Sequence, residues 1–170
     1  MSALHVSRKL FLDSVAGLSE AQLNFKPALE KWSIAEVAEH IVLSEPSIFQ
    51  AAEGAIKSPA REKMADPGKI DEKILTVVPN RTIKAAAPEA LRPHQQFKTT
   101  AAAIYFFKSE RDQHNEVLER DPGRPARAFF QQSSLGDIDA FQWILFMSAP
   151  TERHVAQINE VKASAGFPQQ

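Results

Sequence analysis

Hydrophobic residues recur at intervals of three and four along most of this chain, which is the period of an amphipathic helix. Four long segments with this pattern cover residues 2–16, 33–56, 93–120 and 137–162, and a short helix is predicted over 20–24. No segment shows the sustained alternation of a β-strand. The pattern therefore predicts an all-α domain built as a four-helix bundle.

Capping signals mark two of the predicted helix starts. Ser33 and Glu36 form an S-x-x-E capping box, in which each side chain accepts a hydrogen bond from the other residue's free backbone amide. Ser19 and Gln22 form a smaller box in front of the short helix. These signals predict where the short helix and the second long helix begin.

The other boundaries depend on proline and aspartate. Pro93 is a suitable first-turn residue for the third long helix, and the Asp-Pro-Gly run at 121–123 ends it. Either Asp137 or Asp139 opens the last helix. Pro46 lies inside the second helix and is expected to kink it.

The stretch between the second and third long helices is punctuated by prolines, and only residues 69–77 have the pattern of a short helix. A connection of this length allows the third helix to start at the far end of the bundle. The sequence therefore predicts one long crossover between the second and third helices.

Length, charge and cysteine content limit the classes of partner and chemistry that this chain can have. The 170 residues predict a single domain over 1–170. Because 20 basic residues face 21 acidic ones, charge does not favour a nucleic-acid or anionic-membrane partner. Apolar runs fall far short of the roughly 20 residues that span a bilayer, and no signal-peptide core is present, so we expect a cytoplasmic protein. The absence of cysteine excludes disulfides, thiolate nucleophiles and cysteine-ligated metals.

Histidines carry the clearest candidate chemistry. At helical spacing His154 is in line with Met147, which places its imidazole on the inward face of the last helix. His40 lies at the margin of the second helix's apolar stripe, where it can face a cavity between helices. Taken singly, each is better explained as a hydrogen-bonded core or boundary residue than as a ligand. His94 and His114 have polar neighbours and are predicted to be solvated.

Several segments, in order and at their separations, resemble the motifs of one family. They are KWSIAEVAEH at 31–40, NRT at 80–82, APE at 87–89, FQWILF at 141–146 and ERH at 152–154 followed by QI at 157–158. This set resembles the DinB-like family of bacterial four-helix-bundle metalloproteins. The similarity covers nearly the whole chain.

The resemblance implies a bundle of up-down-down-up topology with one divalent metal, nickel or zinc, bound by three histidines. One ligand ends the second-helix motif, and that position is His40. The other two form an H-x-x-x-H pair on the last helix, whose spacing places both imidazoles on one face. The second of this pair matches His154, but the first falls on Pro150.

Pro150 is therefore the main departure from the family pattern. Proline has no ligating atom, so a site that needs three protein ligands has lost one of them. Pro150 is also expected to bend the last helix, at a cost of about 3 kcal/mol in a helix interior. Glu36, one turn before His40, and His114 on the third helix are candidate replacements. The sequence requires neither, because Glu36 already has a capping role.

The activity implied by the resemblance is transfer of a low-molecular-weight bacterial thiol, such as bacillithiol or mycothiol, to or from a small electrophile. The metal would stabilise the thiolate. Because one ligand is missing, we interpret the chain as an impaired relative of these metal-dependent thiol S-transferases. The alternative is a non-catalytic bundle that binds a small molecule, or forms a homodimer, without metal. Arg153, beside the last histidine, is predicted to be solvated and not an anion contact.

Overall fold

The computed structural model describes residues 3–60, 66–84, 86–120, 127, 129–133 and 135–169. The elements are α1 (Ala3–Val15), α2 (Glu20–Asn24), α3 (Ile34–Lys57), α4 (Pro67–Val77), the 3₁₀ helix η1 (Glu89–Leu91), α5 (Thr100–Arg120), β1 (Phe130–Ser133), β2 (Gly136–Asp139) and α6 (Ala140–Lys162). The predicted all-α class is confirmed, because the two strands form only a small antiparallel hairpin. Within the described ranges, no helix is long and apolar enough to cross a membrane.

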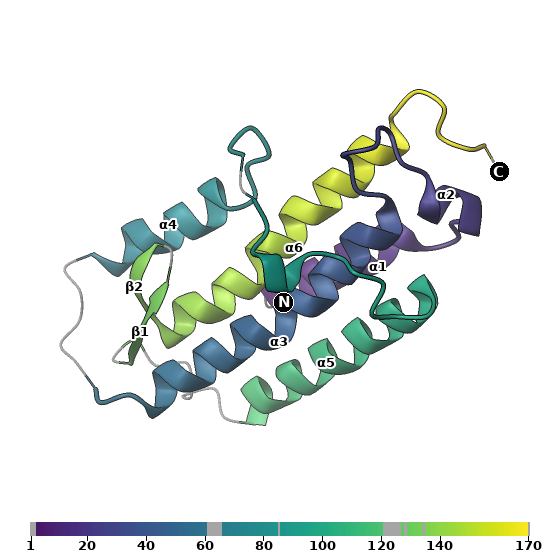
Figure 1. Ribbon diagram of the computed structural model, residues 1–170. Coiled ribbons are helices and arrows are strands. Elements are labelled where there is room, and N and C mark those ends of the chain that lie inside the picture. Colours follow the sequence, from purple (N-terminus) through teal and green to yellow (C-terminus); the bar gives the residue numbers. More distant parts are fainter. Residues whose placement is uncertain are drawn as a thin grey trace.

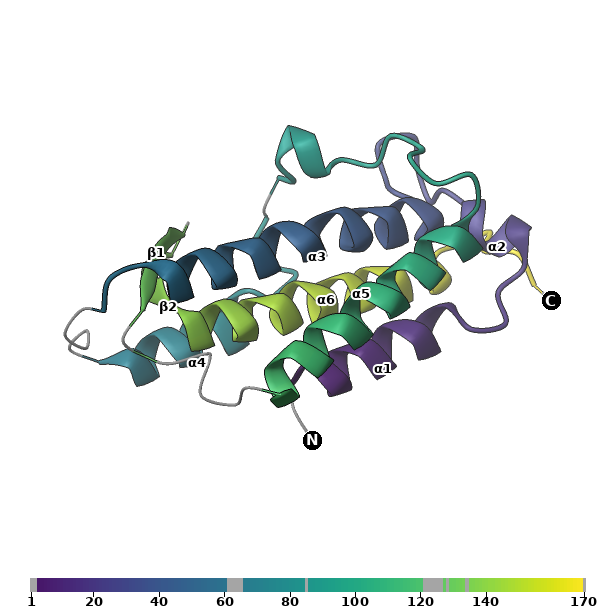
Figure 2. The same cartoon turned by 90° about the horizontal axis from the view of Figure 1, so that it is seen from below.

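The four long helices α1, α3, α5 and α6 pack side by side around a common core (Figures 1 and 2). Helix α6 lies against α1 and α3, and α5 completes the ring by contacting the same two helices. Phe11, Val37, Phe107 and Ile158, one from each helix, are fully buried in this core. Each side chain of this kind stabilises the fold by about 1.5–3 kcal/mol on burial, so the predicted apolar stripes account for the association.

Contacts between the helices establish their directions. His40, near the start of α3, lies against His154, near the end of α6, so these helices are antiparallel. Phe11, near the end of α1, packs on Phe107, near the start of α5. Glu39 of α3 binds the chain just before α5, so α3 and α5 begin at the same end of the bundle. The long connection that carries α4 and η1 returns the chain to that end (Figure 2).

The predicted capping boxes are present. Ser33 Oγ accepts from the amide of Glu36 at 3.2 Å, and the Glu36 carboxylate accepts from the amide of Ser33 at 2.8 Å. The same reciprocal pair precedes α2. A further box opens α6, where Asp139 accepts from the amide of Gln142 at 2.7 Å. The second of the two predicted aspartates is therefore the N-cap of the last helix.

The third long helix begins later than predicted, at Thr100 and not near Pro93. The buried carboxylate of Glu39 accepts the backbone N–H groups of residues 94–96 at 2.8 to 3.2 Å. Gln95 adopts a left-handed φ of 60°, which no α-helix contains. A side chain of α3 thus takes the amides that a first helical turn would have used.

Replacing Glu39 by Gln is expected to lower the free energy of unfolding by about 1–3 kcal/mol, because an NH₂ group would face backbone donors that need an acceptor. The matched control is Glu36→Gln on the same helix. Glutamine also completes a capping box, and the lost ion pair with Lys26 is partly exposed, so the control should change stability by less than about 1 kcal/mol. Urea denaturation of both variants measures the difference. Equal effects would contradict a structural role for the Glu39 contacts.

The β-hairpin departs from the prediction that no segment forms strands. Each strand has only four residues, too few for a clear alternation in the sequence. Gly136 supplies a φ of 96° at the turn, and Ile138 packs with Trp143 and Ala55 in a second apolar cluster between α3 and α6. Figure 1 shows the hairpin at the same end of the bundle as α4. The predicted helix stop at 121–123 lies outside the described residues.

A buried ion pair joins the four long helices. Arg111 of α5 has no exposed surface, and its guanidinium binds both carboxylate oxygens of Glu45 in α3. The remaining guanidinium N–H groups donate to the carbonyl of Leu4 at 3.0 Å and the hydroxyl of Ser7 at 2.8 Å, both in α1. A longer contact of 3.4 Å reaches the hydroxyl of Thr151 in α6. The buried guanidinium of α5 therefore forms hydrogen bonds with groups on the three other long helices.

Both interior prolines lie within continuous helices: α3 runs through Pro46 and α6 through Pro150. Hydroxyl groups close to each proline donate to helix carbonyls, from Ser44 at 2.7 Å and from Thr151 at 3.1 Å. The bends expected at these prolines stay predictions.

Candidate functional site

His40 of α3 and His154 of α6 lie next to each other. Their ring centroids are 4.6 Å apart and the rings meet edge to face, at an interplanar angle of 80°. His40 is buried, with 7% of its surface exposed, and His154 is partly buried. The two imidazoles selected from the sequence thus share one environment. Their role as metal ligands stays a prediction.

Each of the two imidazoles is held through its Nδ1 atom. His40 Nδ1 lies 2.6 Å from the carbonyl oxygen of Leu91, at the end of η1. His154 Nδ1 lies 3.1 Å from Oε1 of Gln157, about one turn further along α6. The indole of Trp32 covers part of His40, with ring centroids 5.0 Å apart. A hydrogen bond at one ring nitrogen orients the imidazole and leaves the other nitrogen for a different partner.

The surroundings favour the neutral form of both rings. Burial, with a smaller effect from the neighbouring His40, lowers the pKa of His154 to about 3, against the opposite effect of the hydrogen bond that Gln157 Oε1 accepts. Burial also lowers the pKa of His40, against the effect of the Leu91 carbonyl. At neutral pH the pair therefore consists of two uncharged imidazoles, the form in which histidine binds metals.

The low pKa of His154 makes the fold sensitive to acid. The unfolded chain takes up a proton near the ordinary pKa of 6.5, whereas the folded chain does so only near 3. The contribution of His154 to the free energy of unfolding is therefore fully present above pH 6.5. It is lost as the pH falls from 6.5 toward the folded-state pKa of about 3. Between pH 7.5 and 5.5 we expect His154 to contribute a loss of about 1.4 kcal/mol in the free energy of unfolding. Urea midpoints at the two pH values measure it.

The control for this titration is His154→Gln, which should lack that part of the acid loss. An equal pH dependence for His154→Gln and the unsubstituted protein would contradict the low pKa of His154.

The crossover segment is fastened to α6 beside the histidines. Arg81 forms a forked ion pair with Glu160, at 3.1 and 2.7 Å, and also donates to Oε1 of Gln157 at 3.3 Å. Arg153 donates to the carbonyls of Val78, Asn80 and Ile83. The prediction of a solvated Arg153 is therefore wrong: helical spacing points this side chain away from the core, but the crossover, distant in sequence, covers it.

Neither candidate for the third ligand is available beside the pair. The Glu36 carboxylate is used in the capping box and pairs with Lys26 at 2.7 Å. His114, predicted to be solvated, is buried, stacks on Phe49 with ring centroids 3.9 Å apart, and contacts Glu45 through Nδ1 at 3.3 Å. Across the described ranges, no three His, Asp or Glu side chains gather in a way that could hold a metal ion.

The residues around His40 and His154 can be compared with those that the nickel or zinc site of the resembled family requires. Two neutral imidazoles are suitable donors for nickel or zinc. The position to which the family resemblance assigns the third imidazole is residue 150, a proline, which offers no donor atom. The residues present therefore do not fit a three-histidine centre.

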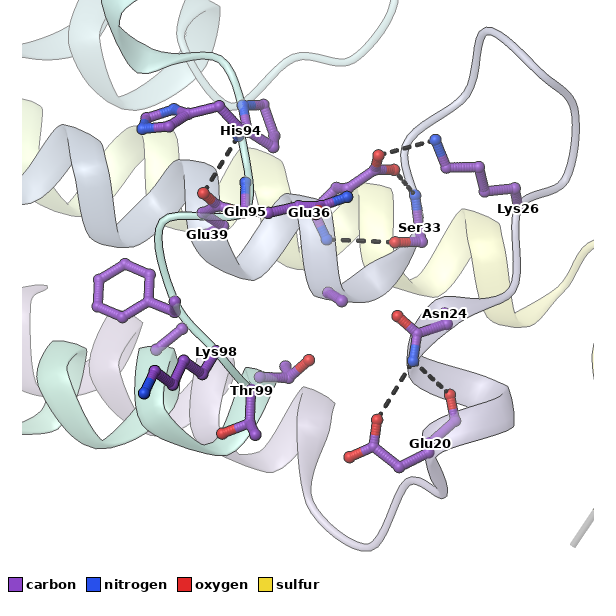
Figure 3. A pocket seen from close by; sticks show the side chains of 15 residues that line it. Glu20, Asn24, Lys26, Ser33, Glu36, Glu39, His94, Gln95, Lys98 and Thr99 are labelled. Carbon is purple, nitrogen blue, oxygen red and sulfur yellow. Dashed lines mark hydrogen bonds and ion pairs between the residues drawn. The ribbon is translucent and has the colours of Figure 1, made fainter.

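A separate groove of about 620 Å³ lies between α2, the start of α3 and residues 93–100 (Figure 3). Its acidic side chains are all engaged: Glu20 accepts from Asn24, Glu36 completes the α3 cap, and Glu39 binds the backbone before α5. His94 lines the groove, but neither histidine of the pair does. The groove is thus distinct from the paired imidazoles.

Comparisons with known proteins give a family match and a related sequence. A family model described as the DinB superfamily matches residues 3–158. The chain is 28% identical over 162 residues to the uncharacterized protein YuaE of Bacillus subtilis (strain 168), a match that covers 95% of this chain and 96% of that protein. No solved structure matches the chain significantly.

Proposed function

Because this chain belongs to the DinB superfamily, we propose that it is a relative of metal-dependent thiol S-transferases that has lost the metal-dependent activity. In this proposal the three-histidine metal centre is reduced to His40 and His154. The observation that carries the proposal is the position of Pro150, which lies about one turn before His154 on the same helix. An imidazole at that point would complete the H-x-x-x-H pair.

The chemistry of the family depends on a bound cation. A divalent metal stabilises a thiolate relative to a thiol at neutral pH and so supplies a nucleophile that a protein without cysteine lacks. A catalytic zinc site uses three protein ligands and keeps one position open for the substrate. Since the described residues offer the two imidazoles but no group of three His, Asp or Glu side chains that could hold a metal ion, we expect nickel or zinc to bind weakly and to exchange freely.

The test is elemental analysis of protein produced without an affinity tag in metal-replete medium. We expect nickel and zinc well below one equivalent, and no metal-dependent transfer of a low-molecular-weight thiol to a model electrophile. One equivalent of either metal, lost in both His40→Ala and His154→Ala, would overturn the proposal.

The alternative function is a metal-free bundle that binds a small molecule or dimerises. This alternative is favoured by the proline at position 150, because a proline in place of the family's histidine supplies no metal ligand and no reactive group. Thermal shifts with low-molecular-weight thiols, in the presence of a chelator, separate the two hypotheses. Stabilisation that persists in chelator and disappears in His154→Ala supports the metal-free binding function.

A further inference from the structure

The outward face of α5 is hollowed. The main contacts of α5 are with α1 and α3, on the side that carries the buried Phe107 and Arg111. The opposite side lies at the edge of the bundle (Figure 1), where side chains at helical spacing surround a surface groove of about 450 Å³. The residues that line this groove, which we call the α5 stripe, are Tyr105, Lys108, Ser109, Asp112, Gln113 and Glu116.

The α5 stripe has the same spacing when it is read in either direction along the helix. Two copies of the helix packed antiparallel about a two-fold axis therefore bring the first residue of one stripe opposite the last residue of the other. In such an interface the same surface patch is used by both copies, and each contact occurs twice. The facing pairs are Tyr105 with Glu116, Lys108 with Gln113, and Ser109 with Asp112.

Each facing pair joins a hydrogen-bond donor to an acceptor. The phenol of Tyr105 can donate to the carboxylate of Glu116, and the hydroxyl of Ser109 can donate to that of Asp112. The ammonium of Lys108 can donate to the amide oxygen of its facing glutamine. It also lies only one residue, about 1.5 Å along the helix axis, from facing Asp112. Helical period alone gives the spacing, but the chemical match depends on which side chains occupy it.

The charges of the α5 stripe are available to a second copy. Lys108 is exposed and forms no ion pair with another described residue. Arg8 of α1 holds the Asp112 carboxylate at 2.9 and 3.0 Å, and a carboxylate has about four acceptor sites, so Asp112 can accept from Lys108 of another molecule as well. Tyr105 has 75% of its surface exposed, and tyrosine is enriched at protein interfaces. The stripe thus has an aromatic anchor and complementary charges.

We propose that this protein self-associates through the α5 stripe, as a two-fold dimer in which the two α5 helices pack antiparallel and Lys108 of each copy pairs with Asp112 of the other. This inference rests on the dimerising alternative of the function proposed above and gives it a specific surface. It does not depend on whether the histidine pair binds a metal. Because the contacts are polar and mainly from one helix of each copy, the dimer is weak and sensitive to salt.

Sedimentation velocity in the presence of a chelator, at chain concentrations from about 1 µM to about 1 mM, tests the proposal. We expect a species of twice the chain mass to grow with concentration, and its dissociation constant to rise with added sodium chloride. Lys108→Glu places like charges opposite each other in both copies of the contact. It should raise the dissociation constant at least about 10-fold.

A mixture of two charge variants identifies the pairing. Lys108→Glu and Asp112→Lys should each dimerise poorly alone, whereas a mixture of the two should form a heterodimer, because both of its contacts between positions 108 and 112 join opposite charges. The matched control is Lys73→Glu on α4, which makes the same charge change outside the α5 stripe and should leave the dimer unchanged. All three positions are exposed, so the variants should stay folded, as circular dichroism would show.

Three results would contradict the proposed dimer. They are a chain that stays monomeric at every concentration, a dimer that Lys108→Glu leaves intact, and a mixture that assembles no better than the single variants. Elemental analysis tests the proposed function separately. Little metal and no dimer would refute only the α5 interface, whereas one equivalent of metal in an intact α5 dimer would refute only the loss of the metal centre.

Discussion

Glu45→Gln is expected to lower the free energy of unfolding by about 3–5 kcal/mol, because it leaves the Arg111 guanidinium buried without its counter-charge. Arg111 has no exposed surface and binds both carboxylate oxygens of Glu45. Burial would raise the pKa of Glu45, but hydrogen bonds from Arg111 and His114 outweigh it, so the pKa lies below its ordinary value and the pair is charged. The midpoint of guanidinium-chloride unfolding at constant m-value measures the loss.

Two controls show that the effect belongs to the buried pair. The exposed pair of Glu116 and Arg120 on α5 is the surface counterpart, and Glu116→Gln should change stability by less than about 1 kcal/mol. The double substitution Glu45→Met with Arg111→Met should be more stable than Glu45→Gln, because apolar replacement of a whole buried pair is often neutral. A Glu45→Gln protein within 1 kcal/mol of the unsubstituted chain, roughly the surface value, would contradict the prediction.

Pro150→His is expected to raise the affinity for zinc or nickel by at least about 100-fold, because it supplies the third imidazole of a catalytic-type site. The new side chain would lie on the same helical face as His154, one turn away, and His154 is already beside His40. The gain should disappear in His40→Ala and in His154→Ala. Isothermal titration with each metal at neutral pH, on chelator-treated protein, gives the dissociation constants.

Pro150→Ala is the matched control for that gain, because it removes the proline without adding a ligand. It restores an amide that can donate to the carbonyl of Phe146, and it should stabilise the helix by about 1–3 kcal/mol without improving metal binding. If Pro150→His binds zinc no better than Pro150→Ala, the centre was not a three-histidine site with a vacant ligand position.

Local chemistry determined much of the helical framework. Each capping box uses residues three positions apart, so Ser33 with Glu36 defines the start of α3 without help from the rest of the chain. The apolar stripes likewise predicted which faces are buried, because helical period alone decides which residues share a face. The pairing of His40 with His154 was expected from a family resemblance, since periodicity could place each ring inward but not next to the other.

The tertiary structure decided the features that depend on residues far apart in the sequence. Glu39 binds the amides of residues 94–96, and α5 therefore begins only at Thr100. The local sequence cannot predict this, because the partner lies on another helix. Helical spacing predicted a solvated Arg153 and polar neighbours predicted a solvated His114, but the crossover covers the first and the bundle interior encloses the second. Local sequence specifies the helices because their caps and stripes act over a few residues. The Leu91 carbonyl at His40 and the Arg81 guanidinium at Gln157 required the crossover to be in place, because both come from that segment.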